Sequence, residues 1–373
     1  MEYIAASARF MAVTWDSNGS NVGVLPLGKN DTSQLNTSSL FFLDAIGRQD
    51  HLSVRRLKAH SDLVTDLVFS PFDDGLLATG SADQKIKIWR IPSCGLKDDL
   101  SQPVVELADQ PRRVERIRWH PSASCVLGSA SGDQVSVWDL IKEQSVLGTF
   151  HGNTVQDLAW QTLGSLMATT ARDKTVRIYD LRAGVEAIME TVSHQGVKDS
   201  KLVWVDDQTI LTTGFTASRN RQVMIRDTRN ISSPVHTLDL DISSGILLPL
   251  YDPDTKMMFL AGRGDSHIQF VEVTNTDPYI VPGLRYSGEQ TKGACLVPKR
   301  GLNVMMGEVN RLLQVADTSI IPVTWQVPRK TYHDFHSNIF PDTAGPVAAM
   351  GPQDWLLGSN LAPDKISLGN ILI

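Results

Sequence analysis

The stretch HSDLVTDLVFSPFDDGLLATGSADQKIKIWR, residues 60–90, carries most of the information about the fold. Its first part alternates apolar and polar residues, as a strand with one buried face does, and a turn rich in Pro, Asp and Gly follows. A short apolar strand then ends in the small residues Ala78 to Ser81. An Asp-containing turn leads to a third alternating strand that ends on Trp89. The stretch therefore predicts three strands joined by tight turns.

Two further segments repeat this order of elements. They are RRVERIRWHPSASCVLGSASGDQVSVWD, residues 112–139, and HGNTVQDLAWQTLGSLMATTARDKTVRIYD, residues 151–180. The aromatic residues that end the third strands, Trp89, Trp138 and Tyr179, lie 49 and 41 residues apart. These spacings bracket the roughly 40–45 residues of a four-stranded propeller blade. The repeat resembles the WD40 pattern and predicts an all-β propeller.

Weaker copies continue the repeat along the chain. Copies begin at Lys201, Gly245 and Cys295, and the segment RFMAVTWDSNGSNVGVLPL near the start supplies two more strands. We therefore predict a seven-bladed WD40 β-propeller over residues 1–321. The remaining residues, 322–373, do not repeat, and we expect them to form a C-terminal extension packed against the propeller.

Composition excludes several classes of protein. The 373 residues are 42% hydrophobic and 20% charged, the balance of a globular protein with a large core. A net charge of -6 argues against a protein that coats nucleic acid. No apolar run reaches the roughly 20 residues that span a bilayer, so we expect no membrane insertion. The three widely spaced cysteines are expected to be free thiols of a cytosolic protein.

Polar residues recur at matching places in the repeats, and we assign them structural roles. In the first repeat His60, Asp83 and Trp89 lie where WD40 blades link their strands by side-chain hydrogen bonds. Buried polar groups must be paired, and such a network pairs them. The predicted network residues are His60, Asp83, Trp89, Asp133, Trp138, His151, Asp173 and Tyr179. The second repeat departs from the pattern, with Gln110 in place of the histidine and a shorter turn.

No arrangement of residues indicates catalysis. The sequence has no nucleophile elbow, no His-Glu-x-x-His pair and no convergent carboxylate pair, so we expect no catalytic residue, no cofactor and no metal site. An enzyme would need acid and base residues clustered at the mouth of the central channel. Arg263-Gly264-Asp265 spells the tripeptide of cell-adhesion ligands, but we interpret it as a tight turn between strands.

Basic residues are the candidates for contacting a partner. Arg116 aligns with Asp66 in the preceding repeat and with Asp157 in the following one, which predicts ion pairs between blades. Arg112 and Arg113 precede the strand and are candidates for binding an acidic partner, the alternative being a solvated turn. The full candidate set is Arg55, Arg56, Lys58, Arg112, Arg113, Arg329 and Lys330.

Several segments together resemble the coronins over nearly the whole chain. They are the first repeat, ILTTGF followed by RQVMIRDTRN, LLPLYDPDTKMMFLAGRGD, KGACLVPKRGL and VPRKTYHDFHSNIFPDTAG. The PDTAG element after VPRK and the DPDT turn are more specific than WD40 character alone. The stretch TDPYIVPGLRYSGEQTKGACLVPKR is most similar to the first propeller of the long, tandem-propeller coronins of the Pod type.

The resemblance implies a non-catalytic scaffold or regulator that binds actin filaments and belongs to the cytoplasm and cytoskeleton. It implies roles in cell polarity or membrane trafficking, and in crosslinking actin filaments to microtubules. The alternative is a propeller adaptor in membrane trafficking or in a ubiquitin-ligase complex, without direct actin binding.

The resemblance also bears on how the ring closes. It implies that the tail from Pro322 folds back under the propeller and braces it. Coronin propellers usually open with a basic segment that pairs as the outer strand of the last blade, and this sequence starts without it. We therefore expect an exposed strand edge on that blade, with the strand-like residues 364–368 as a substitute partner.

Overall fold

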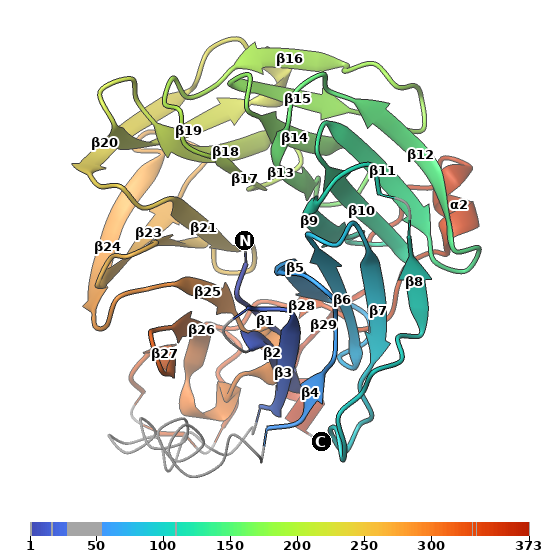
Figure 1. Cartoon of the computed structure of the whole chain (residues 1–373). Coiled ribbons are helices and arrows are strands. Elements are labelled where there is room, and N and C mark those ends of the chain that lie inside the picture. The colour runs from blue at the N-terminus through green and yellow to red at the C-terminus, as the bar shows by residue number, and fades with distance from the viewer. Residues whose placement is uncertain are drawn as a thin grey trace.

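The computed structural model of the chain describes residues 2–15, 18–27, 54–108, 110–329, 331–332 and 334–372. Seven antiparallel sheets stand side by side around a central axis (Figure 1). Within each sheet the strands follow one another in chain order from the axis outward. The predicted seven-bladed propeller is confirmed.

The first blade contains β1 (Ile4–Ala6), β2 (Phe10–Trp15), β3 (Asn21–Pro26) and β4 (Arg56–Leu57), and the second contains β5 (Val64–Phe69), β6 (Leu76–Ser81), β7 (Ile86–Arg90) and β8 (Val105–Leu107). The third contains β9 (Val114–Trp119), β10 (Val126–Ser131), β11 (Gln134–Asp139) and β12 (Gln144–Phe150), and the fourth contains β13 (Val155–Trp160), β14 (Met167–Ala171), β15 (Thr175–Tyr179) and β16 (Met189–Val192). The fifth contains β17 (Lys201–Trp204), β18 (Thr209–Phe215), β19 (Asn220–Asp227) and β20 (His236–Ile242), and the sixth contains β21 (Leu247–Asp252), β22 (Met257–Gly262), β23 (His267–Val273) and β24 (Ile280–Ser287). The seventh contains β25 (Gly293–Leu296), β26 (Glu308–Val315) and β27 (Ile320–Gln326). Beyond the blades lie β28 (Thr343–Ala344), α2 (Pro352–Leu356) and β29 (Lys365–Ile366), and the 3-10 helices are η2 (Thr228–Asn230), η3 (Lys299–Gly301), η4 (Val304–Met306) and η5 (Leu368–Leu372).

The second strand of each blade shows why the sequence there is apolar and small. Strands β10 and β14 are buried along their whole length, because the neighbouring blades cover both of their faces. At Gly128 a Cβ atom would come within 2.9 Å of the Met167 Cε atom of the next blade. Small side chains on these strands therefore allow the blades to approach one another closely.

The ring closes through the N-terminal strand. Strand β1 contacts both β5 of the second blade and β25 of the seventh. Ile4 is buried in a cluster that also contains Val297 and Leu313 of the seventh blade. The closure between the first and seventh blades is therefore a packing contact between inner strands.

The seventh blade has three strands, and no other strand in the described part of the chain pairs with the outer edge of β27. The expectation that residues 364–368 cover this edge is wrong, because β29 pairs with β28 instead, with Ile366 opposite Thr343. Strand β27 also runs through the expected boundary between residues 321 and 322. We therefore propose that the propeller extends to Gln326 and the extension begins after it.

The propeller has two faces that differ in their loops. The face on which each inner strand begins is called the starting face. It carries the connections between blades and the turns between second and third strands. We call the opposite one the tail face, which carries the turns between first and second strands. The turn at residues 82–85 lies on the starting face, and the loop at residues 120–125 lies on the tail face.

The extension lies on the tail face. The amide of Ala349 donates to the Ser122 carbonyl, and the Ser124 amide donates to the Met350 carbonyl, both at 3.0 Å. These bonds attach the chain just before α2 to the first loop of the third blade. In Figure 1 the extension accordingly runs behind the ring, so the face toward the viewer is the starting face.

A buried tryptophan docks α2 onto two blades. Trp355 is 1% exposed and lies edge-on to His120 and Trp160, with ring centroids 5.0 and 5.6 Å away. Its indole Nε1 donates to the Gly164 carbonyl at 3.1 Å, the same oxygen that lies 3.0 Å from His120 Nε2. Burial lowers the pKa of His120 to about 4, so this imidazole is neutral at physiological pH.

Candidate protein-interaction site

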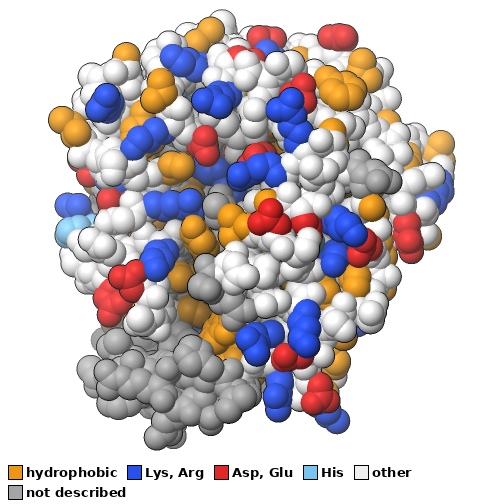
Figure 2. Space-filling view, in the orientation of Figure 1, with side chains coloured by type: hydrophobic (Ala, Val, Ile, Leu, Met, Phe, Trp, Pro, Cys, Tyr) orange, Lys and Arg blue, Asp and Glu red, His pale blue; other side chains and the backbone are white. Residues whose placement is uncertain are grey.

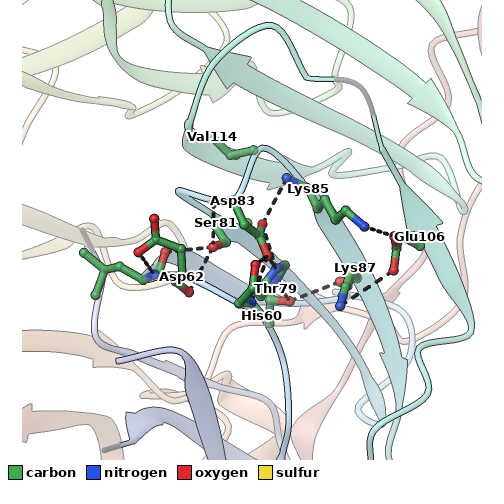
Figure 3. Close-up of polar contacts among 12 residues, drawn as sticks. His60, Asp62, Thr79, Ser81, Asp83, Lys85, Lys87, Glu106 and Val114 are labelled. Carbon is green, nitrogen blue, oxygen red and sulfur yellow. Dashed lines mark hydrogen bonds and ion pairs between the residues drawn. The ribbon is translucent and has the colours of Figure 1, made fainter. Parts of the chain in front are cut away.

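The second blade contains a continuous chain of side-chain hydrogen bonds (Figure 3). Trp89 Nε1 donates to Thr79 Oγ1 at 3.0 Å, and that hydroxyl lies 2.8 Å from His60 Nε2. His60 Nδ1 lies 3.0 Å from Asp83 Oδ2, which favours the tautomer with the proton on Nδ1. The predicted residues His60, Asp83 and Trp89 thus meet, and Thr79 is the link that the sequence analysis did not name. The chain ties β6 and β7 to the connection that precedes β5 and to the turn between β6 and β7.

We expect Thr79→Val to lower the free energy of unfolding by about 2–4 kcal/mol. The valine would leave the Trp89 indole N–H and the Nε2 atom of His60 without a partner, and each buried orphan costs about 1–3 kcal/mol. Chemical denaturation would measure the loss. Thr79→Ser keeps the hydroxyl and should lose far less, so equal losses in both variants would show that the methyl group matters and not the hydrogen bonds.

The third and fourth blades carry incomplete versions of this chain. Trp138 Nε1 donates to Ser129 Oγ at 2.8 Å, but Asp133 makes no side-chain hydrogen bond to the described residues. Its turn is a two-residue hairpin with Gly132 at a positive φ, so the carboxylate is placed differently from that of Asp83. The predicted network contact of Asp133 is therefore absent among the described residues, because the shorter turn changes the position of its side chain.

In the fourth blade an arginine separates two predicted partners. The Tyr179 hydroxyl lies 3.5 Å from His151 Nδ1, so these two residues meet. Asp173 does not contact His151, because Arg177 lies 2.8 Å from the carboxylate and 3.3 Å from the imidazole. Burial, with the neighbouring charge of Arg177, lowers the pKa of His151 to about 4.

The fifth blade holds a chain that the sequence analysis missed. His194 Nε2 lies 3.0 Å from Thr212 Oγ1, and its Nδ1 lies 3.2 Å from Gln222 Oε1. Arg226, in the place of the tryptophan, donates to the same threonine at 3.4 Å. The separation of histidine and threonine is 18 residues here and in the fourth blade, and 19 in the second, so this spacing could have revealed the network.

Buried charges line the channel where the inner strands begin. Arg116 lies 3.5 Å from Asp66, 3.0 Å from Asp157 and 3.1 Å from Glu2, which confirms the predicted ion pairs with both neighbouring blades. Arg118 adds contacts of 2.9 Å to Asp66 and 3.3 Å to Glu2. These ion pairs join the inner strands β5, β9 and β13 of three neighbouring blades to one another and to the N-terminal residue Glu2.

The electrostatics of this cluster act in opposite directions on two of its carboxyl groups, and burial raises the pKa of Asp66. Burial opposes the ionisation of Glu2, but Arg116, Arg118 and Lys201 together lower its pKa to about 2. Burial, assisted by the charge of Arg116, lowers the pKa of Lys201 to about 8. The cluster is therefore a structural joint between blades and not an arrangement of free acids and bases.

The candidate basic residues do not form one surface. Arg112 and Arg113 are exposed on the starting face, in the connection between β8 and β9. Arg55 is exposed and Arg56 half-buried at β4, on the outer edge of the first blade, and Lys58 is exposed just beyond them. Arg329 follows β27, on the side of the tail face, and Lys330 lies outside the described residues.

Arg112 and Arg113 differ in their contacts with the rest of the chain. Arg113 Nε lies 2.8 Å from Glu115, whereas Arg112 has no ion pair with any described residue. The aliphatic part of the Arg112 side chain lies over Gly132, where a Cβ atom would come within 2.6 Å of it. Arg56 is held 4.0 Å from Asp99. The viewed face in Figure 2 carries more basic than acidic side chains, although the chain as a whole is acidic.

The described parts of the chain lack two features that would indicate other functions. No helix there is long and apolar enough to cross a bilayer. No group of three or more His, Cys, Asp or Glu side chains there is placed to hold a metal ion.

The seven blades and the hydrogen-bonded His60, Thr79 and Trp89 define a WD40 β-propeller. Models of the WD domain, G-beta repeat match residues 52–90 and 144–180, and a model of a type of WD40 repeat matches residues 320–363. Sequence comparison gives 44% identity over 324 residues with coronin-7 of Bos taurus, covering 86% of this chain and 35% of that protein. Identity with human coronin-2A is 36% over 320 residues, covering 83% of this chain and 60% of that protein.

The chain belongs to the coronin family. The solved WD40 domain of Toxoplasma gondii coronin superposes with a TM-score of 0.87 at 26% identity, covering 98% of this chain and 90% of that domain. The chain spans about a third of the length of the coronin-7 relatives that it matches. The match to residues 320–363 covers β27 and most of the extension.

Proposed function

We propose that the chain is a non-catalytic scaffold that binds actin filaments, in the cytoplasm and associated with the cytoskeleton. Its membership of the coronin family supports this proposal. The observation on which it rests in this molecule is the exposed basic pair Arg112 and Arg113, of which Arg112 has no acidic partner among the described residues. Wider roles in cell polarity, in membrane trafficking and in linking filaments to microtubules belong to the same proposal.

A basic surface that meets an acidic filament should bind in a salt-dependent manner, because salt screens exposed charges. We expect this chain to sediment with filamentous actin at low salt and to be released as salt is raised. The double variant Arg112→Glu/Arg113→Glu should weaken binding by at least about tenfold, which corresponds to about 1.4 kcal/mol. Co-sedimentation across a salt series measures both effects.

A matched control separates a local effect from a change in net charge. Lys97 and Lys256 are exposed on loops of the tail face, so Lys97→Glu/Lys256→Glu alters the net charge equally on the opposite side. This control should bind as the unmodified chain does. A loss equal to that of the arginine variant would overturn the assignment of the starting face. No sedimentation at low salt would refute actin binding by this chain and favour an adaptor for membrane trafficking or for a ubiquitin ligase.

A further inference from the structure

The starting face has a pocket between the first blade and the sixth and seventh blades. Its volume is ≈ 750 Å³, which lies within the roughly 300–1,000 Å³ of common ligand sites. Its lining combines apolar side chains with two basic ones, and includes Tyr3, Leu63, Arg263, Lys292, Val315 and Asp317. The predicted turn at Arg263-Gly264-Asp265 joins β22 to β23 and brings Arg263 to this pocket.

The Arg263 guanidinium has no hydrogen bond and no ion pair with any residue that the structure describes, and its Nε atom is fully enclosed. Its contact is with the ring of Tyr3, whose centroid lies 5.2 Å from Cζ. Arg263 is half-buried, and burial lowers its pKa, as expected of a partly desolvated charge without an acidic partner among the described residues. Arg221, on the preceding blade, shows the usual outcome, because it meets both Asp241 and Asp265.

The carboxylates near Arg263 already form ion pairs with other basic residues. Glu2 lies against Arg116 and Arg118, at 3.1 and 3.3 Å. Asp317 lies 2.7 Å from Lys292, so the second basic residue of the pocket is paired. The pocket therefore contains one half-buried positive charge without an acidic partner among the described residues, and an acidic group would pair it.

We propose that this pocket binds an acidic side chain of a peptide segment from a partner protein, with the carboxylate on Arg263. A planar guanidinium matches a carboxylate in two parallel hydrogen bonds. The apolar lining at Leu63 and Val315 suits the residues next to the acidic one, and the volume exceeds what a lone ion fills. The proposal does not rest on actin binding, since the pocket is distinct from the Arg112 and Arg113 loop.

The test uses two pools of blocked pentapeptides with Ala, Leu and Tyr at the outer positions. One pool has glutamate at the centre and the other has glutamine. Binding to the full chain is measured by fluorescence polarisation, and we expect the glutamate pool to bind at least about tenfold more tightly. Arg263→Met should abolish this preference. It should also leave the melting temperature equal or higher, because an unbranched apolar side chain removes the unpaired charge.

Arg219 provides the matched control. It is exposed on the starting face in the turn between β18 and β19, so Arg219→Met changes the net charge equally and should keep the preference for glutamate. Equal binding of the two pools, or a preference that survives Arg263→Met, would overturn the proposal. A lower melting temperature of Arg263→Met would also overturn it, because the arginine would then stabilise the fold through its contact with the Tyr3 ring. Inorganic phosphate that binds alone and displaces the glutamate pool would identify a phosphate site and refute the peptide.

Discussion

Trp355→Ala is expected to release the C-terminal extension from the propeller and to cost about 3–5 kcal/mol, the usual loss for a buried tryptophan. Trp355 is 1% exposed and is the side chain of α2 that enters the gap between the third and fourth blades. Its removal would take away the ring contacts to His120 and Trp160 and the hydrogen bond to Gly164. Chemical denaturation measures the total loss.

Hydrogen exchange shows where that loss falls. The amides of residues 349–358 should lose protection in Trp355→Ala, while those of β10 and β14 keep it, because an undocked extension leaves the blades intact. Leu357→Ala is the matched control, since this leucine follows α2 directly and is 79% exposed. A loss below about 1 kcal/mol with unchanged exchange would show that other contacts hold the extension, for example the bonds from Arg182 to Ser359 and Asn360.

The repeat made the propeller predictable, because each blade is built from the same alternation of strand and turn. The ion pairs of Arg116 were predictable for the same reason, since equivalent positions of neighbouring inner strands face one another in a ring. The docking of Trp355 was not, because the extension does not repeat. A single buried tryptophan in such a segment has no pattern against which to align it.

Residue identity was a poorer guide than spacing in the hydrogen-bonded networks. In the fifth blade Gln222 and Arg226 make the contacts that Asp83 and Trp89 make in the second, because an amide oxygen and a guanidinium can accept and donate as those groups do. Conversely, Asp133 has the expected identity, but a shorter turn places it away from a partner. The basic candidates show the same limit, because residues that look alike in sequence fall on opposite faces according to which strand end they follow.

Arg116→Met is expected to lower the free energy of unfolding by about 3–5 kcal/mol, the cost of removing one partner from a buried ion pair. The arginine is 1% exposed and joins Asp66, Asp157 and Glu2, which come from the second blade, the fourth blade and the N-terminus. Without it, three carboxylates would face one another with Arg118 and Lys201 as the remaining counter-charges. Urea denaturation of the two proteins measures the difference.

The dependence of that difference on pH identifies its electrostatic origin. The pKa of Glu2 is lowered to about 2 in the folded chain, so the stability that it contributes is present above its unfolded pKa of 4.5 and is lost as pH falls toward 2. In Arg116→Met the orphaned carboxylates should instead hold protons more readily in the folded state. The gap between the two proteins should therefore shrink as pH falls through this range.

A second substitution tests whether the orphaned charge, rather than lost packing, causes the loss. Asp66→Asn in the Arg116→Met background removes one of the facing carboxylates and should recover part of the stability, whereas Asp66→Asn alone should destabilise. Arg113→Met, on the exposed ion pair with Glu115 in the same segment, should cost no more than about 1 kcal/mol. Additive losses in the double variant, with a gap independent of pH, would mean that Arg116 acts through its bulk. The charges would then not be what joins the inner strands of neighbouring blades.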